Sequence, residues 1–268
     1  MSSWDISGGS MIGRNHRLVG KNNQDAWCVK QTAEYTVAVV ADGCGSAAHS
    51  EVGASIGAQL TVELLSQQAS SGQEINWRQL ERAVMSQLDV LVRALALPYR
   101  EAIERFCLFT LVGVVIGPER SVFFVCGDGI VVTNGVMTEL GPFPGNMPPY
   151  LAYQLLESEL QLDPDLVRIK PLLEMPTHEL SSFLLGTDGV TDLARLEHQM
   201  RPGLETTVGP LAQFWQNDRY FRGNPELISR ELKLIGRDWP LQEPEPGLLG
   251  DDTTMIVGRH RLVDGDEL

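Results

Sequence analysis

The sequence predicts an α+β fold in which antiparallel strands alternate with pairs of helices. Short apolar runs end in an acid beside a glycine, as at 37–43, which is typical of a buried strand that stops in a tight turn. Two amphipathic segments follow one another between residues 50 and 97. Two β-rich runs are joined by a Gly-Pro-Glu-Arg turn at 117–120, which favours a meander over alternating βαβ units.

The length and composition fit either one large domain or two small ones, and we favour one. With 268 residues, of which 43% are hydrophobic, the chain can bury a sizeable core. We therefore expect a single domain over 1–268. The segment 140–150 is too rich in proline and glycine for regular structure, and 151–160 has the pattern of a short helix. We interpret about 139–176 as an inserted surface segment.

The N-terminal half predicts two strands and then two helices. Strands are expected at 26–31 and 37–41. Ser50 is a candidate N-cap for the first helix, which is expected to end before a small polar loop at 67–73. Its expected core face is Val52, Ile56, Leu60 and Leu64. The second helix has apolar residues at helical spacing from Leu80 to Leu95, and Pro98 stops it.

The C-terminal half predicts further strands and one clear helix. The expected strands are 106–116, 121–125, 179–185 and 253–259. Gly127–Gly129 interrupts the second of these, which is expected to resume at 130–133. Asn224 followed by Pro225 predicts the start of a helix that runs to Ile235.

The charge and the cysteines exclude several classes of protein. The chain has 35 acids against 21 bases, a formal net charge of −14, which argues against binding to nucleic acid or to an anionic membrane. No apolar stretch approaches the ~18 residues of a membrane span, and the first residues lack a signal-peptide pattern. The four cysteines show no CxxC spacing and are interpreted as reduced thiols. We expect a cytoplasmic monomer.

Acids recur at the ends of the expected strands. These acids are Asp25, Asp42, Asp128, Asp188 and Asp251. A fold that gathers the strand ends would gather the carboxylates, which repel one another unless cations balance them. Ligation by oxygen alone favours Mg²⁺ or Mn²⁺ over zinc. The alternative is that these are acidic turns scattered over the surface of an acidic protein.

Five ordered motifs give the chain a family resemblance. They are NNQDA, VVADGCGS, VCGDG, LLGTDGVTD and GDDTTMIV, and they lie between Gly13 and Val257. Together they resemble the signature motifs of the metal-dependent protein phosphatases, the type 2C serine/threonine phosphatases. The resemblance implies a four-layer αββα sandwich with two central antiparallel sheets flanked by helix pairs. It also implies metal ions in a cleft at one end of the sandwich.

The resemblance implies specific roles for the acids. Asp42 would bridge two metal ions, with the Gly43 carbonyl on one of them. Asp188 and Asp251 would complete the other ion, and Asp25 would hold metal-bound water or bind the metal directly.

A third, weaker metal site is implied at Asp128 and Asp192. The cofactor would then be Mg²⁺ or Mn²⁺, with two ions or three. Asp42, Asp188 and Asp251 are the implied catalytic set, because they hold the ions whose shared water attacks phosphorus in line.

One departure from the family concerns substrate phosphate. Family members commonly have an arginine five residues before the first aspartate, where this chain has Gly20. Lys21 and His16 are the candidate phosphate-binding residues, with Arg14 and Arg17 as further candidates. A lysine offers a point charge where an arginine offers a fork of donors.

Three other positions qualify the resemblance. Gln24 replaces a common glutamate and cannot add charge to a metal site. Cys44 stands where eukaryotic members have a histidine that is a candidate general acid. Asp252 is interpreted as a turn or supporting residue, not as a ligand.

These observations predict a phosphatase acting on phosphoserine or phosphothreonine in proteins. Its partners would be phosphorylated protein substrates, and it would oppose a serine/threonine kinase. Two alternatives stay open. One is a catalytically inactive member that binds a partner or a phosphopeptide, and the other is a phosphatase for small phosphomonoesters.

Overall fold

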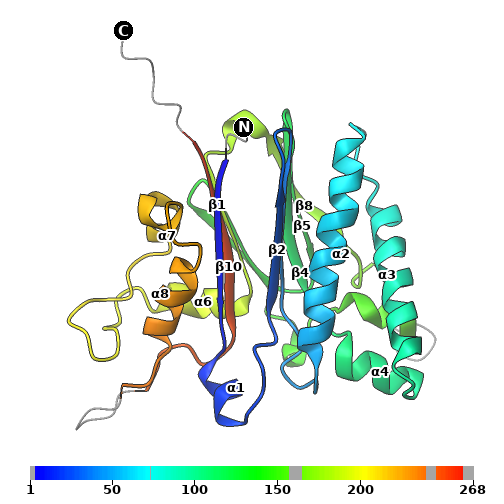
Figure 1. The fold of residues 1–268 in the computed structure, drawn as a ribbon, viewed down its shortest axis with the longest axis horizontal. Helices are drawn as coiled ribbons and strands as arrows, with labels where there is room; N and C mark the ends of the chain where they lie inside the picture. Colours follow the sequence, from blue (N-terminus) through cyan, green and yellow to red (C-terminus); the bar gives the residue numbers. More distant parts are fainter. Residues whose placement is uncertain (1–3, 73, 157–164, 240–245, 262–268) are drawn as a thin grey trace.

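The computed structural model describes residues 4–72, 74–156, 165–239 and 246–261, and it confirms the predicted fold class. Two five-stranded sheets are stacked face to face, and all of their strand pairs are antiparallel. Helices cover the two outer faces, which gives the αββα order of layers seen in Figure 1.

Each sheet has its own order of strands. The first sheet has the order β1 (Trp4–Met11), β10 (Thr253–His260), β9 (Ser182–Gly186), β6 (Gly129–Thr133), β7 (Val136–Leu140). The second has the order β2 (Ala26–Gln31), β3 (Thr36–Ala41), β4 (Leu111–Ile116), β5 (Arg120–Cys126), β8 (Lys170–Pro176). Strands β1 and β2 are therefore edge strands, one in each sheet, and β8, which lies within the predicted insert, is a strand of the second sheet.

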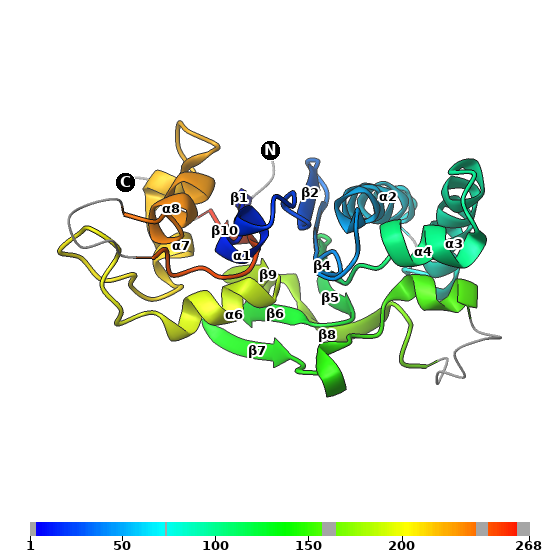
Figure 2. The ribbon, with the colours of Figure 1, turned by 90° about the horizontal axis from the view of Figure 1, so that it is seen from below.

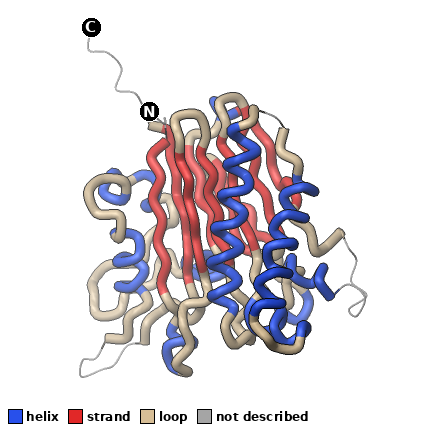
Figure 3. Tube along the Cα trace, turned by 45° about the vertical axis from the view of Figure 1, so that its right-hand side comes forward, coloured by secondary structure: helices blue, strands red, loops and turns tan. Residues whose placement is uncertain are grey.

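The helices fall into two groups. The group on the second sheet is α2 (Ser50–Ser70), α3 (Trp77–Ala94) and α4 (Tyr99–Phe106), and the group on the first sheet is α6 (Asp188–Arg195), α7 (Gln213–Gln216) and α8 (Leu227–Ile235). Figures 2 and 3 show the strands enclosed between these two groups. The short helix α1 (Arg14–Leu18) lies at one end of the sandwich, opposite the start of β1 (Figure 1).

Apolar side chains fill three layers. Phe123, Phe183 and Ile256 are among those buried between the two sheets. Separate buried clusters lie under α2 and α3 and under α6 to α8. The six-residue strand β3 has no exposed residue, as expected for a strand covered on both faces.

The predicted core face of the first helix is wrong. Val52 is exposed, and α2 instead buries a face of small residues that includes Gly53, Ala54, Gly57 and Ala58. A Cβ atom on Gly57 would stand 2.3 Å from the ring of Phe109, so the missing side chain lets the helix approach the sheet closely. The helix also continues to Ser70, through most of the predicted loop at 67–73.

The strand predicted to resume after Gly129 belongs to the other sheet. Strand β5 pairs with β4 and β8, whereas β6 pairs with β7 and β9, so the chain crosses between the sheets at 127–129. The predicted strand 106–116 begins only at Leu111, and its first predicted residue, Phe106, is the last residue of α4.

Other elements differ in their bounds or were not predicted. Helix α8 begins at Leu227, and the Asn224 side chain accepts a hydrogen bond from Glu226 N (3.0 Å) in the turn before it. In the predicted short helix at 151–160, residues 151–156 form a 3₁₀ helix, and the remainder lies outside the described residues. Strands β1, β7 and β8 and helices α1, α4 and α6 were not predicted. Within the described ranges, no helix is long and apolar enough to cross a membrane.

Candidate metal-dependent active site

Asp42 follows directly after β3, where backbone hydrogen bonds fix the chain. Thr110 N donates to the Asp42 carbonyl (2.8 Å), and Gly43 N donates to the Gln24 carbonyl (3.1 Å). Burial raises the pKa of the Asp42 carboxyl well above its ordinary value, and the charges of neighbouring acids, Asp25 first among them, raise it further. The rigid strand thus delivers a carboxyl to a place where its charge is unfavourable.

Asp25 enters the same region from the start of β2. Its Oδ2 accepts a hydrogen bond from Thr187 Oγ1 (2.8 Å), whereas its Oδ1 is buried without a hydrogen-bond partner. Burial raises the pKa of Asp25 well above its ordinary value, followed by the charge of Asp252. A buried acceptor oxygen without a hydrogen-bond donor is unfavourable in free energy. A cation bound beside Oδ1 would offset that cost.

Asp188 and Asp128 complete the group from the first sheet. Asp188 follows β9 and opens α6, and its carboxyl shares a hydrogen bond with that of Asp42. Burial, and then the charge of Asp251, raise the pKa of Asp188. Burial and the nearby Asp188 raise the pKa of Asp128 to about 6. Four acids from separate segments thus interact with one another.

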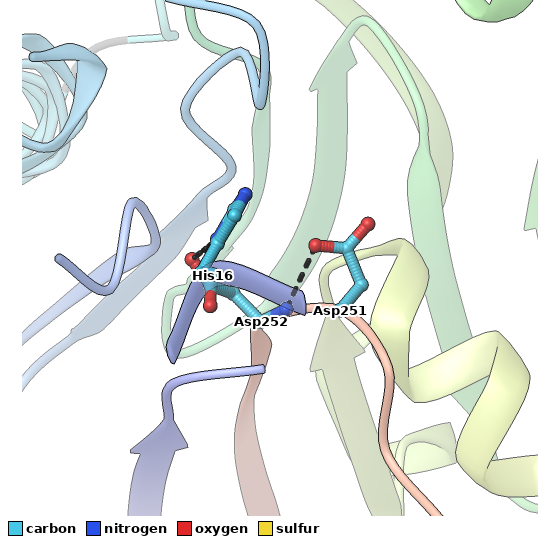
Figure 4. A group of neighbouring side chains, drawn as sticks. All are labelled: His16, Asp251 and Asp252. Carbon is cyan, nitrogen blue, oxygen red and sulfur yellow. Dashed lines mark hydrogen bonds and ion pairs between the residues drawn. The ribbon is translucent and has the colours of Figure 1, made fainter. Parts of the chain in front are cut away.

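Asp251 and Asp252 are neighbours with different surroundings. Asp251 is exposed, and its charge contributes to the raised pKa values of Asp42 and Asp188. Asp252 is 3% exposed and accepts hydrogen bonds from Gly13 N (2.6 Å) and Gln24 N (2.6 Å). Figure 4 shows the Asp251 carboxyl directed away from that of Asp252.

The remaining candidate acid lies at the edge of the group. Asp192 is exposed and pairs with Arg195 (3.2 Å), which also contacts Glu139 (3.3 Å). Its charge contributes to the raised pKa of Asp188, so it is close to the group without being buried in it.

The two candidate phosphate-binding residues are both engaged. Lys21 Nζ donates to the carbonyls of Gly45 and Ala47 in the loop after Asp42. His16 Nδ1 lies 2.8 Å from Asp252 Oδ2. Lys21 therefore stabilises that loop in this structure, and His16 presents only its second nitrogen to a ligand.

Gln24 has a structural position. It is 1% exposed, and its Nε2 donates to the Ala47 carbonyl (3.0 Å) and to Ser50 Oγ (2.7 Å). Its amide ties the start of β2 to the first turn of α2, a role that a charged glutamate could not fill as a donor.

The acids fit a divalent cation. Among the described residues, no lysine or arginine forms an ion pair with Asp25, Asp42, Asp128, Asp188 or Asp251. The group offers oxygen donors only, including the unpartnered Oδ1 of Asp25. Such a donor set suits Mg²⁺ or Mn²⁺.

Sequence reasoning missed two supporting residues. Thr187 holds Asp25 through its hydroxyl, and Gly13 lets α1 pack on the Asp251 turn, since a Cβ atom there would lie 2.3 Å from the Asp251 carbonyl carbon. Asp252 was interpreted as a supporting residue, but its contact with His16 was not foreseen. The doubled acid in GDD was the available signal for it.

Comparison with known proteins places the chain in a family. The model of the protein phosphatase 2C family matches residues 12–220, so this chain belongs to that family. Comparison with curated proteins gives no significant match.

One solved structure shares the fold at low sequence identity, and others are similar to the chain. The chain resembles a bacterial serine phosphatase variant with a TM-score of 0.51 and 13% identity, over 97% of this chain and 100% of that one. It is also similar to the serine/threonine phosphatase Stp1 from Staphylococcus aureus (TM-score 0.49, 14% identity, 95% and 94% of the chains). A third structure is the catalytic domain of the serine/threonine protein phosphatase PstP in complex with two manganese ions (TM-score 0.47, 17% identity, 96% and 97% of the chains).

Proposed function

We propose that this chain is a metal-dependent phosphatase that hydrolyses phosphoserine and phosphothreonine monoesters in proteins. The observation that carries the proposal is the group of carboxyls around Asp42. Its members come from separate strand ends and raise one another's pKa, and no basic side chain in the described residues pairs with them. Family membership supports a phosphatase of this general kind.

The ions would be Mg²⁺ or Mn²⁺, held chiefly by four acids. Asp42 would contact both ions and the Gly43 carbonyl one of them. Asp188 and Asp251 would complete the other ion, and Asp25 would hold metal-bound water or bind the metal directly. Divalent ions in such a site lower the pKa of water and offset the charge that develops on a phosphoryl group.

A weaker third ion would use Asp128 and Asp192. Asp192 would have to leave Arg195 or share its carboxyl with it. We therefore expect this ion to bind last.

The chain's own contribution is to hold the acids in place. The Thr187 hydroxyl fixes one oxygen of Asp25 and also accepts a hydrogen bond from Thr254 N (3.1 Å). This pair of bonds joins the start of β2 to β9 and β10, so acids from the two sheets keep their separation. Preorganised positions of this kind avoid a reorganisation cost during the reaction.

Protein substrates would contact the predicted insert. A groove of about 780 Å³ beside the Asp42 loop is lined by residues of that loop, of α4 and of the segment 143–153. Exposed Met147 and the neighbouring prolines give it an apolar wall. We propose that this flap-like segment selects protein substrates.

We further propose a single-domain monomer that acts in the cytoplasm and opposes a serine/threonine kinase. The proposed compartment is supported by Cys28, Cys44, Cys107 and Cys126, which are all free.

A second candidate function is an inactive member that binds a phosphorylated partner. The observation in its favour is that Lys21 donates to two backbone carbonyls. Lys21 is then not free to bind the substrate phosphate in place of the missing arginine. A phosphatase for small phosphomonoesters is the third candidate. It would be favoured if the flap proved irrelevant to substrate choice.

One assay separates these candidates. Purified protein is tested on p-nitrophenyl phosphate and on a phosphothreonine peptide with EDTA, Mg²⁺ or Mn²⁺. The proposed function predicts hydrolysis of both compounds with metal and none with EDTA. Hydrolysis of p-nitrophenyl phosphate alone favours a small-molecule enzyme, and metal binding without any hydrolysis favours the binding protein.

The flap is tested by replacing Phe143–Pro148 with a Gly-Ser linker. The replacement stops before Tyr150, which is buried in the core under α2 and α3. We expect altered kinetics on the phosphopeptide and nearly unchanged hydrolysis of p-nitrophenyl phosphate. Equal losses on both substrates would show that the segment supports the fold and does not select substrates.

A further inference from the structure

His16, Asp251 and Asp252 form a compact group at the end of the sandwich. One donor atom from each residue lies within 4.8 Å of the others. His16 comes from α1 and the two acids from the turn before β10, as Figure 4 shows. A histidine beside the strand-end acids adds a nitrogen donor to a site that was expected to contain oxygen donors only.

The carboxyl of Asp252 is already occupied. Its Oδ1 accepts a hydrogen bond from Gly13 N, and its Oδ2 accepts one from Gln24 N, each at 2.6 Å. Oδ2 also lies 2.8 Å from His16 Nδ1. Asp252 therefore serves as an acceptor that orients His16, and it has little capacity left for a metal ion.

This contact determines which nitrogen of His16 is available. Because a carboxylate accepts the bond, Nδ1 carries the proton, and the neutral ring then presents the lone pair of Nε2. Nε2 faces the loop after Asp42, since a Cβ atom on Gly45 would lie 3.6 Å from it. A carboxylate that holds the far nitrogen of a histidine is the usual support for a metal-binding imidazole.

Backbone hydrogen bonds fix the position of His16 relative to Asp251. Arg14 N donates to the Leu249 carbonyl (3.0 Å), and Asn15 N donates to the Gly250 carbonyl (2.9 Å). These bonds dock α1 onto the turn that carries Asp251. Because Asp251 also acts electrostatically on Asp42 and Asp188, the histidine stands beside the acidic group.

We propose that His16 Nε2 and a carboxylate oxygen of Asp251 bind the same divalent ion. This nitrogen makes the site prefer a first-row transition ion such as Mn²⁺ to Mg²⁺, because Mg²⁺ takes oxygen ligands whereas imidazole suits transition ions. The inference rests on the proposed function, since it concerns one ion of the same active site. It assigns His16 to the metal and not to the substrate phosphate.

Pulsed electron paramagnetic resonance of the Mn²⁺-loaded protein tests the ligand directly. A coordinated imidazole adds ¹⁴N modulation to the Mn²⁺ signal. We expect this modulation in the wild type, its replacement by a ¹⁵N pattern after labelling with ¹⁵N-histidine, and its loss in His16→Ala. The matched control is His49→Ala, whose ring stacks on Phe106 at 5.0 Å between centroids, and it should keep the modulation.

Calorimetry measures the selectivity. We expect His16→Ala to weaken Mn²⁺ binding by about tenfold or more and Mg²⁺ binding by less than about twofold. Asp252→Asn removes the negative charge that holds Nδ1–H and leaves one acceptor oxygen for three donors, so it should weaken Mn²⁺ binding in the same direction by about tenfold. Thermal melting without metal checks that each variant is folded.

Three outcomes overturn the inference. Wild-type protein that binds Mn²⁺ and hydrolyses phosphoester without ¹⁴N modulation would show that His16 is not a ligand, while the proposed function stands. Modulation that persists in His16→Ala would assign the nitrogen elsewhere. A wild type that binds neither Mn²⁺ nor Mg²⁺ would contradict the proposed function as well.

Discussion

Glu231 and Asp42 are both carboxyls that the fold withdraws from water, but their surroundings differ. Glu231 in α8 is 6% exposed and contacts Arg201 and Arg219, the latter at 3.4 Å. Arg201 is fixed in turn by the carbonyls of Thr207 (2.8 Å) and Val208 (3.0 Å). The protein itself supplies the positive charge in this region.

The Asp42 region has acids where the Glu231 region has arginines. Asp25, Asp188, Asp251 and Asp128 all raise the pKa of Asp42, after burial itself. In the Glu231 region the arginines balance the buried charge without a ligand. In the Asp42 region the carboxylates are stable as a cluster of anions only when a cation from outside binds among them. Uncompensated burial of acidic groups therefore distinguishes the Asp42 region from the Glu231 region and supports the proposal of a metal site there.

We expect the greatest change in turnover when Asp42 loses its charge. Asp42→Asn removes the carboxylate charge that would hold the proposed metal ions and removes no core packing, so turnover should fall by more than about a thousandfold, roughly 4 kcal/mol of transition-state stabilisation. Asp188→Asn should behave alike. Steady-state kinetics with Mn²⁺ measure the loss, and Asp218→Asn, on the exposed surface, is the control.

Retention of more than about a tenth of wild-type turnover in Asp42→Asn would contradict the two-metal assignment, because the loss would then be under ~1.4 kcal/mol. Circular dichroism shows whether the variant is folded.

The second prediction removes the carboxylate from the ion pairs around Glu231. Glu231→Ala leaves Arg201, whose side chain is 13% exposed, without its partner. We expect a loss of about 3 kcal/mol in the free energy of unfolding, because removal of one member of a buried ion pair leaves an uncompensated charge. Urea denaturation gives the value. A change below about 1 kcal/mol would mean that water already reaches Arg201.

A smaller effect of opposite sign is expected in the acidic region. The pKa of Asp128 is about 6 in the folded protein, above its ordinary value of 3.8, because of burial and Asp188. The folded state thus binds this proton more tightly than the unfolded state. The stability that it contributes is present at about pH 4 and is lost as the pH rises through 6.

Asp128→Asn should remove this pH-dependent loss of stability. Without metal, the variant should gain on the order of 1 kcal/mol relative to wild type between pH 4 and pH 7. The difference between the two proteins cancels the other titrating groups. Urea denaturation at several pH values in EDTA measures it, and a difference that does not change with pH would contradict the assigned cause.

The same contrast shows what the sequence could predict. The acids after β3 and β9 were predictable because each follows a short apolar run, and Asp25 was predictable because it directly precedes an expected strand. The elements at 26–31, 36–41 and 253–260 match their predicted bounds closely for the same reason. Local patterns thus predicted the candidate acids and the strands that carry them.

What could not be predicted depends on contacts between distant segments. The bonds from Asp252 to His16 and Gly13 join residues 236 and 239 positions apart. The small residues on the buried face of α2 make room for the ring of Phe109, a contact with a distant segment that the spacing of the larger apolar residues did not indicate. The two arginines that contact Glu231, Arg201 and Arg219, likewise come from two separate segments before α8.

The last prediction adds a positive charge at Gly20, the position where the resembled family commonly has an arginine. Gly20 has φ +72, and a Cβ atom there would meet nothing within 4 Å. Gly20→Arg therefore has room, at a backbone cost of about 1 kcal/mol for a side chain in this conformation. A phosphate dianion is already attracted by divalent ions, so the guanidinium adds positioning more than essential charge. We expect KM for p-nitrophenyl phosphate to fall a few fold and kcat to change less.

Gly20→Ala carries the same backbone strain without the charge and is the matched control, and calorimetry with Mn²⁺ verifies that metal binding is intact in both. Equal KM values in the two variants would show that the position does not reach the phosphate. If the wild type binds metal but hydrolyses neither substrate, and Gly20→Arg does not restore hydrolysis, the chain is a binding protein and its acidic region holds ions without catalysis.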